Sequence, residues 1–335
     1  MTGVAFGIFD SLERTDAPLG TLYENRLRLA EQADAAGFRT YHVAEHHATR
    51  LGMAPSPGVY LGAVAQRTRR LRFGPLVYVL PLYNPLRLIE EICMLDQMSG
   101  GRFELGVGRG ASPYELAYCG VAFHESREMF EEALEVIRAG LQGGRLRHRG
   151  RHYRYDGVPL ELACVQKPHP PLWQGIASRD SAAETAKQGV NVVMSAPIAS
   201  VKALAESYFE ACDGAAGGSP LVGCSRFVFV GESDAEALAI ARPAYQAWYE
   251  SVTSLWRAFG AVPHRFAPSL ERALAGDTAI VGAPATVRAE VERHLAETGC
   301  NYFVGRFAFG DLAHEHAARS MALFASEVMP KLAAS

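Results

Sequence analysis

The chain has 335 residues, of which 49% are hydrophobic and 21% charged, with a formal net charge of −3. This composition supports a large core, and the length fits two domains or one α/β barrel. The charge provides no basic field for nucleic acid or an anionic membrane surface. No segment approaches the roughly 20 apolar residues that span a bilayer, and the N-terminus lacks the charged and apolar regions of a signal peptide.

Six cysteines are scattered along the chain without a C-x-x-C pair, at positions 93, 119, 164, 212, 224 and 300. This spacing is typical of buried thiols in a reducing compartment and not of a disulfide framework. We therefore expect a soluble, cytoplasmic protein that binds neither nucleic acid nor a membrane.

Short apolar runs alternate with helical patterns through the first 141 residues. The patterns predict strands at 4–9, 40–44, 71–80 and 102–107, and helices at 21–36, 58–68, 85–98 and 126–141. Asn84 is expected to cap the third of these helices and Pro85 to open it. Residues 112–114 are expected to lead into a loop.

Residues 143–166 interrupt this rhythm, and their Arg/His/Tyr alternation with an Asp156-Gly157 turn indicates a hairpin-like insertion. The alternation then resumes. The patterns predict strands at 172–175, 190–194, 223–230 and 302–305, helices at 181–189, 200–211, 234–259, 284–297 and 314–332, and a lid or long loop at 260–282. Eight strand–helix units with right-handed crossovers predict a single (β/α)8 TIM barrel over residues 1–335.

In such a barrel the catalytic groups lie in the loops after the strands, and Glu45-His46-His47 follows the second predicted strand. Two imidazoles can exchange protons near neutral pH, although surface or helix-capping roles are open on these residues alone. We expect no metal site, because the chain has no H-E-x-x-H or Cys/His spacing. Consecutive strand residues also point to opposite faces. No G-x-S-x-G motif suggests a serine hydrolase.

A glycine-rich segment at 102–111 follows on the same face. Gly106 and Gly108 let the backbone approach a ligand, and Arg109 supplies a cation for an anion. With Ala111 they also satisfy G-x-G-x-x-A, which leaves an NAD-dependent dehydrogenase as an alternative. That fingerprint normally opens a helix at once and begins a Rossmann domain, whereas three strand–helix units precede this one. A plain glycine-rich turn is a third interpretation.

Three further strand-end or helix-start features carry charge or hydroxyl groups. Ser178 or Ser181 can cap the helix near 181, leaving backbone N–H groups for a phosphate. Arg127 could add a second cation, and Arg306 follows the last predicted strand on the same face. A simple N-cap and ordinary solvated arginines would explain these residues equally well.

Together these segments resemble the bacterial luciferase-like flavin monooxygenases. The resemblance is carried by Ala44-Glu45-His46-His47, residues 79–87, residues 95–110, the Ala-Ser-x-x-Ser-Ala segment at 177–182, and residues 299–303 and 324–330. It covers nearly the whole chain, and it implies a TIM barrel in agreement with the strand–helix count.

The resemblance also implies roles for individual residues. His46 matches the catalytic histidine beside the flavin, with Glu45 and His47 in support, and Leu76-Val77 matches a non-prolyl cis peptide beneath the isoalloxazine. The residues that match the remaining flavin-binding positions, most of them at the phosphate, are Gly108, Arg109, Arg127, Ser178, Arg179, Ser181 and Ala182. Residues 260–282 match a mobile lid.

The implied activity is oxygenation of a small organic substrate by reduced FMN and dioxygen, with the FMN supplied by a separate flavin reductase to a homodimeric enzyme. Gly108 stands where the light-emitting subunit has a reactive cysteine, so we do not expect light emission. One alternative is deazaflavin-dependent hydride transfer on the same fold. A non-catalytic flavin-binding subunit is another, against which the intact His46 argues.

Overall fold

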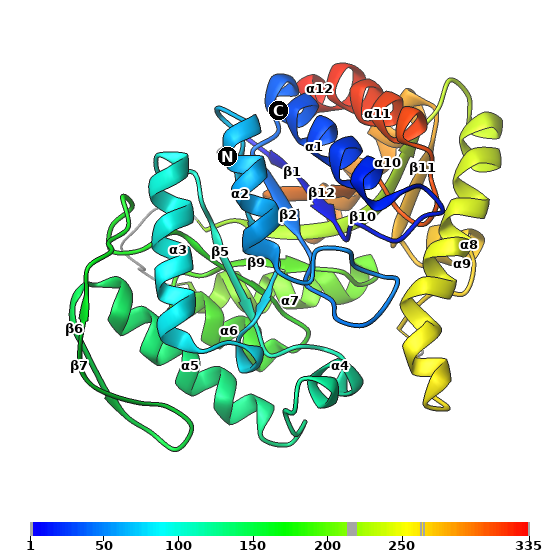
Figure 1. Cartoon of the computed structure of the whole chain (residues 1–335). Helices are drawn as coiled ribbons and strands as arrows, with labels where there is room; N and C mark the ends of the chain where they lie inside the picture. The colour runs from blue at the N-terminus through cyan, green and yellow to red at the C-terminus, as the bar shows by residue number, and fades with distance from the viewer. Residues whose placement is uncertain (1–2, 213–219, 262, 264, 334–335) are drawn as a thin grey trace.

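The computed structural model describes residues 3–212, 220–261, 263 and 265–333 (Figure 1). Its main sheet is parallel, with strand order β3-β2-β1-β12-β10-β9-β8-β5-β4 and with β11 pairing β10 off this path. The strands are β1 (Ala5–Asp10), β2 (Thr40–Val43), β3 (Arg72–Pro75), β4 (Tyr78–Val79), β5 (Leu105–Gly108), β8 (Leu172–Gly175), β9 (Asn191–Met194), β10 (Val222–Val230), β11 (Ala279–Gly282) and β12 (Tyr302–Arg306). A bridge between Phe73 of β3 and Phe103, just before β5, links the two sides of the sheet, which confirms the predicted TIM barrel.

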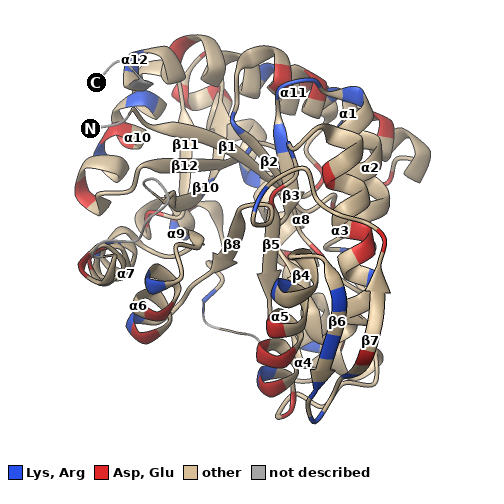
Figure 2. Ribbon diagram, turned by 90° about the vertical axis from the view of Figure 1, so that its left-hand side faces the viewer, with Lys and Arg blue, Asp and Glu red and all other residues tan. Residues whose placement is uncertain are grey.

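Helices surround the sheet, as Figure 1 and the turned view in Figure 2 show. They are α1 (Leu19–Ala36), α2 (Pro57–Arg67), α3 (Pro85–Ser99), α4 (Pro113–Tyr118), α5 (Ser126–Leu141), α6 (Arg179–Lys187), α7 (Ile198–Ala211), α8 (Asp234–Ala258), α9 (Leu270–Ala275), α10 (Pro284–Thr298), α11 (His314–Leu323) and α12 (Met329–Ala333). Two one-turn elements, η1 (Leu80–Leu82) and η2 (Phe324–Val328), complete the set. The Asn84 side chain accepts hydrogen bonds from the backbone N–H groups of Leu86 and Arg87, which confirms the predicted cap of α3.

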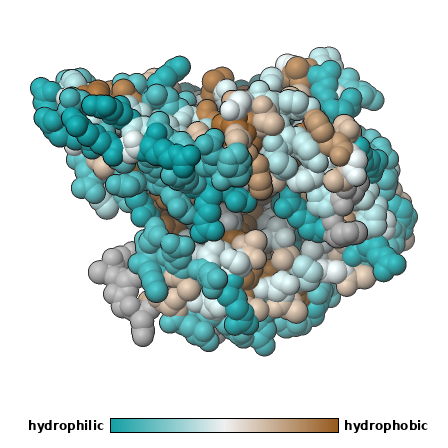
Figure 3. Space-filling model, turned by 90° about the horizontal axis from the view of Figure 1, so that it is seen from below, coloured by the Kyte–Doolittle hydropathy of each residue, from teal (hydrophilic) through white to brown (hydrophobic). Residues whose placement is uncertain are grey.

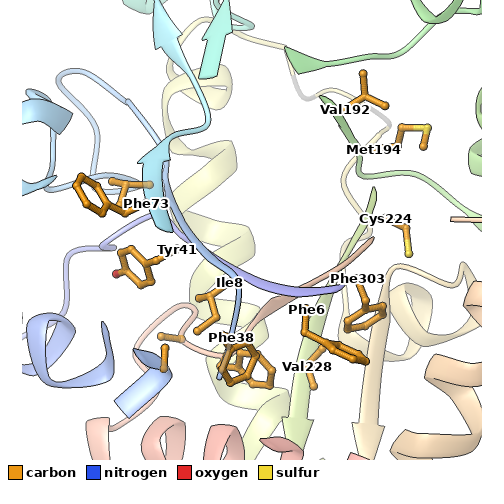
Figure 4. Packing of buried hydrophobic residues seen from close by; sticks show 14 of the residues in the cluster. Phe6, Ile8, Phe38, Tyr41, Phe73, Val192, Met194, Cys224, Val228 and Phe303 are labelled. Carbon is orange, nitrogen blue, oxygen red and sulfur yellow. The ribbon is translucent and has the colours of Figure 1, made fainter. Parts of the chain in front are cut away.

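The core lies between the outer face of the barrel and the helices, where side chains such as Phe6, Ile8, Tyr41 and Phe303 pack (Figure 4). The alternate residues point inward and fill the barrel, because successive strand side chains face opposite sides. Trp173, Val193, Tyr302 and Val304 form this inner cluster. The barrel is therefore a packed core, and a ligand has to bind at its mouth.

A buried polar group closes the N-terminal end of the barrel. The Glu104 carboxylate accepts hydrogen bonds from Trp173 Nε1 at 2.7 Å and from Arg39 Nη1 at 2.9 Å. Above it, His42 Nε2 lies 3.0 Å from the Tyr302 hydroxyl. Burial lowers the pKa of His42 to about 4, so this imidazole is neutral at physiological pH and belongs to the core.

Four sequence predictions need correction. The single strand at 71–80 is two strands, β3 and β4, because a cis peptide bond at Leu76–Val77 turns the chain between them. Residues 260–282 are not one long loop, since α9 and the buried strand β11 lie within them. Short elements of four to six residues give too little periodicity to stand out.

The other two corrections concern turns. Residues 112–114 do not lead into a loop, because Ser112 caps the six-residue helix α4 through the backbone N–H of Glu115. The segment after 143 forms the antiparallel pair β6 (Gly144–Arg149) and β7 (Arg154–Leu160). Its turn lies at 150–153, whereas Gly157 sits inside β7 at φ +75° opposite a register shift. Asp156-Gly157 is thus a bulge, for which a positive φ favours glycine.

Candidate active site

Among the hollows at the C-terminal end of the barrel, two contain residues predicted for the site. The first is lined by the loop after β2, by α4 and by the C-terminal half of α8. The second begins at the loops after β5 and β8 and extends along α5 and α6. Figure 3 views the molecule from below and shows apolar side chains in the depth of a central hollow between more hydrophilic rims. These positions agree with the location of active sites in TIM barrels.

The Glu45 side chain holds together several of the groups around the first hollow. Its fully buried carboxylate accepts hydrogen bonds from His47 Nε2 at 2.8 Å, from the Val79 backbone N–H at 3.1 Å and from the Tyr83 hydroxyl at 2.8 Å. The hydrogen bond with Glu45 raises the pKa of His47. Glu45 therefore joins the loop after β2 to the segment after the cis peptide and holds His47 in place.

Glu115 on α4 holds the other imidazole. Its carboxylate lies 3.3 Å from His46 Nδ1 and accepts a hydrogen bond from the His47 backbone N–H at 2.8 Å. Burial raises the pKa of Glu115, but the hydrogen bond with His46 and the neighbouring positive charge outweigh it, so the pKa is lowered overall. A carboxylate that accepts from Nδ1 leaves His46 Nε2 as the free proton acceptor. The sequence indicated His46 but not Glu115, which is 69 residues away.

The opposite wall of this hollow is mostly apolar. It is built by Val252, Leu255 and Trp256 of α8 together with Phe266. The Tyr114 ring packs against it, lying edge-on to Trp256 with ring centroids 5.2 Å apart. These wall residues were not predicted, because helix periodicity marks an apolar face without showing what it contacts.

The cis peptide bond lies at the barrel mouth beside the glycine segment. The Leu76–Val77 bond is cis, as the family resemblance implies. A Cβ atom on Gly108 would come within 2.5 Å of Val77 Cγ2, and one on Gly106 within 1.9 Å of the Pro75 carbonyl oxygen. A side chain at Gly106 would clash with the backbone of this segment, and one at Gly108 would displace the Val77 side chain, so the glycines allow β5 to run close to it.

The second hollow brings together four of the residues predicted at the phosphate, namely Arg109, Arg127, Ser178 and Ser181. Ser178 caps α6, and its Oγ lies 2.9 Å from Ser181 Oγ in a capping box. The N–H groups in the first turn of a helix bind anions favourably. This donor set fits a phosphate group.

The same hollow also contains acidic side chains, namely Glu131, Glu135, Asp180 and Glu184. Arg127 is 73% exposed and pairs with Glu131 at 2.9 Å. Arg109 is exposed, stacks over the Phe123 ring at 5.0 Å and has no carboxylate partner among the described residues. Arg109 is therefore the better-placed cation of the two.

Two predicted phosphate residues lie apart from this group. Arg179 is exposed at the first position of α6 and does not line the hollow. The Ala182 side chain is fully buried in the core, and its backbone N–H donates to the Ser178 carbonyl oxygen at 3.0 Å. Ala182 therefore supports the packing of α6 and offers no free donor.

Within residues 3–212, 220–261, 263 and 265–333, no group of three or more His, Cys, Asp or Glu side chains is arranged to hold a metal ion. In the same part of the chain, no helix combines the length and the apolar character needed to cross a bilayer.

The sequence profile of the luciferase-like monooxygenases matches residues 4–302. The chain therefore belongs to this family of oxidoreductases, and it is an enzyme. It is 38% identical over 334 residues to protein y4wF of Sinorhizobium fredii, covering 98% of this chain and 97% of that one. It is 29% identical over 179 residues, about half of each chain, to the oxygenase component of the flavin-dependent trigonelline monooxygenase of Acinetobacter baylyi.

Solved structures share the fold over almost the full length. Monooxygenase RslO1 from Streptomyces bottropensis superposes with a TM-score of 0.88 at 28% identity, covering 98% of this chain and 99% of that one. The FMN complex of the oxygenating constituent of 3,6-diketocamphane monooxygenase from Pseudomonas putida has a TM-score of 0.84 at 22% identity, with the same coverage. The F420-dependent tetrahydromethanopterin reductase of Methanopyrus kandleri has a TM-score of 0.71 at 18% identity, again with 98% and 99% coverage.

Proposed function

We propose that this protein is the oxygenase component of a two-component flavin monooxygenase. It receives reduced FMN from a separate flavin reductase and uses dioxygen to oxygenate a small organic substrate. The observation that carries this proposal is the hollow in which His46, held by Glu115, faces an apolar wall from α8.

The residues at the barrel mouth fit FMN. Arg109 and the N-terminus of α6 would hold the phosphate, and the segment at Leu76–Val77, which β5 approaches closely at Gly106 and Gly108, would lie beside the ring. Bound reduced FMN would supply the electrons with which dioxygen is activated. The trigonelline monooxygenase to which this chain is similar is named as an oxygenase component. That name supports a separate reductase for this protein as well.

His46 carries the chemistry that the chain itself supplies. With Nδ1 directed to Glu115, Nε2 can accept a proton from the substrate or return one. The resulting imidazolium is stabilised by the Glu115 carboxylate, in the way that a carboxylate orients and stabilises a catalytic histidine elsewhere. Leu51, Leu82 and Leu116 line the hollow around this point with apolar side chains, which would limit the access of water once a ligand is bound.

Substrate profiling tests the proposal directly. The purified protein is mixed with reduced FMN, dioxygen and a panel of small ring ketones, phenols and N-heterocycles, and the products are identified by mass spectrometry. We expect a product with one added oxygen atom derived from dioxygen. Absence of FMN binding in either redox state would refute the proposal.

A second candidate keeps the fold and replaces the cofactor. F420-dependent enzymes share this fold at TM-scores of 0.71 and 0.74, and a deazaflavin would transfer hydride without oxygen. Binding measured side by side for FMN and F420 separates the two, and dioxygen consumption should follow only the first. The NAD-dependent alternative from Gly106–Ala111 has no Rossmann domain in the described fold to support it.

Three finer features belong to the same proposal. We propose a cytoplasmic homodimer, which sedimentation measurements and cell fractionation can test. Within the lid expected at 260–282, we propose that the described residues 265–269, just before α9, close over the first hollow, with Phe266 already lining it. Protection of this segment from proteolysis by FMN and substrate would support closure.

A further inference from the structure

One cation at the barrel mouth has no part in the two hollows. Arg306 is the last residue of β12. Tyr302 and Val304 of this strand point into the barrel, and Arg306, two residues further on, points to the same side. Its guanidinium lies 4.5 Å over the Phe9 ring and 5.0 Å over the Phe227 ring, and Nε donates to Ser225 Oγ at 3.2 Å. Phe9 belongs to the same inner cluster as Leu76 of the cis peptide.

This guanidinium has no carboxylate in direct contact. In the described part of the chain, no carboxylate oxygen lies within the 4.0 Å of an ion pair with Arg306. Burial lowers the pKa of Arg306 to about 10, yet the group stays charged at neutral pH. The two aromatic rings attract the cation but leave its charge unneutralised. Arg306 is half-buried, and a charge partly removed from water is stabilised by a partner of opposite sign, so the arrangement leaves a place for an anion from outside the chain.

The nearest candidate within the chain, Glu13, does not fill this role. Glu13 is buried and accepts a hydrogen bond from the Gly310 backbone N–H at 2.8 Å. Burial, opposed by that hydrogen bond and by Arg26, raises its pKa to about 8. Glu13 acts on Arg306 electrostatically, but none of its oxygens lies within 4.0 Å of the guanidinium, so the position in direct contact with Arg306 stays open.

The position of Arg306 relative to the phosphate site indicates which anion could bind it. The phosphate site lies after β5 and β8, and β12 is separated from β8 by β9 and β10 in the sheet. Phe9 links the cis segment to Arg306, because Phe9 and Leu76 pack against the same inner cluster and the guanidinium lies over the Phe9 ring. A flavin ring held beside Leu76–Val77 would therefore lie near Arg306. Fully reduced flavin loses a proton at N1 near neutral pH and then carries negative charge on N1 and the C2 oxygen, whereas the oxidised ring is neutral.

We propose that Arg306 is a positioning residue that binds the anionic form of reduced flavin and makes the site selective for that redox state. This inference rests on the proposed function, because it requires flavin at the barrel mouth. A charge near N1 is one of the means by which a protein adjusts flavin electronics.

The test compares affinities for two redox states without any turnover. FMN is titrated under anaerobic conditions in its oxidised form and after reduction by dithionite, into wild-type protein and Arg306→Gln. We expect the variant to bind reduced FMN at least ~10-fold more weakly while its affinity for oxidised FMN changes less than about twofold. A selective loss of tenfold corresponds to a bound-flavin midpoint potential about 30 mV more negative.

Two further variants complete the design. Arg306→Lys keeps the charge and should retain most of the preference for reduced FMN. Arg265 also has no acidic partner among the described residues, and it lines the first hollow. Arg265→Gln should change the affinities for oxidised and reduced FMN by the same factor. Equal losses for both states in Arg306→Gln, or a selective loss in Arg265→Gln, would overturn the role of Arg306. Failure of the wild type to bind FMN at all would instead overturn the proposed function.

Discussion

The hollow of His46 and the hollow of Arg109 lie at the same end of the barrel but differ in how firmly their side chains are held. In the first, the carboxylates of Glu45 and Glu115 hold both imidazoles through hydrogen bonds to buried or half-buried groups. In the second, the two arginines are exposed, and one of them pairs with a surface glutamate.

This difference matches the two tasks that we propose. A proton-transferring group needs fixed geometry, since misplacement by about 1 Å can reduce a rate 100-fold. A phosphate needs mainly charge and backbone donors, which tolerate movement. Substitutions in the first hollow should therefore affect turnover, and substitutions in the second should affect cofactor affinity.

The largest effect is expected for His46→Ala. Loss of the proton acceptor should lower substrate oxygenation by about 10²- to 10⁴-fold, while FMN affinity changes by less than about threefold. Single-turnover product formation and FMN titration measure the two quantities. Normal oxygenation by this variant would show that His46 has been given the wrong role.

Arg109→Gln tests whether the second hollow binds the phosphate of FMN. Loss of the unpaired cation should weaken FMN binding by about 10- to 100-fold and leave binding of riboflavin, which lacks the phosphate, unchanged. Arg127→Gln is the matched control, and its effect should be about threefold or less, because this exposed side chain already pairs with Glu131. Equal effects of Arg109→Gln on FMN and riboflavin would place the phosphate elsewhere.

Gly108→Ala tests the contact between β5 and the cis segment. The added Cβ would lie 2.5 Å from Val77 Cγ2, and such overpacking should lower the free energy of unfolding by about 1–3 kcal/mol and weaken FMN binding. Gly62→Ala in α2, where a Cβ meets nothing within 4 Å, should instead be neutral or stabilising by up to ~1 kcal/mol. Urea titrations measure both, and an unaffected Gly108→Ala would mean that the segment can shift freely.

Glu115→Gln should have a smaller effect on the chemistry of the first hollow. The amide oxygen can still accept from the His47 backbone N–H, but the charge beside His46 is lost. We expect turnover to fall by about 10-fold with little change in FMN affinity. Glu131→Gln, on the rim of the second hollow, is the control and should leave turnover within about twofold. A fall in FMN affinity without a fall in turnover would contradict this division of roles.

The smallest effect concerns the His47–Glu45 pair and its dependence on pH. Because this pair raises the pKa of His47 in the folded protein, its stabilisation is complete below the unfolded pKa of 6.5. It is then lost as the pH rises through the folded value. The free energy of unfolding should fall by about 1 kcal/mol or less above pH 6.5 in the wild type, and His47→Gln should lack this step. Urea titrations at several pH values provide the check.

Local sequence was sufficient for the features whose partners lie within one turn of the chain. The cap of α3 by Asn84 and the capping box of Ser178 and Ser181 bond to groups two to three residues away. The alternation of apolar runs with helical patterns likewise predicted the barrel, because each strand–helix unit is encoded by adjacent residues. His46 was predicted from two observations, namely its position after a predicted strand and its match to the catalytic histidine of the family that the chain resembles.

Only the tertiary structure decided which groups meet at the barrel mouth. Glu115 reaches His46 across 69 residues, and Arg306 lies over Phe9 from the opposite end of the chain. β11, four residues long, is recognisable as a strand because it pairs with β10. Contacts of this kind depend on how whole elements pack, and a pattern of period 2 or 3.6 records only which face of an element is apolar. The sequence by itself therefore determined the barrel and its candidate histidine, and packing determined the partners that would make the histidine and the cations functional.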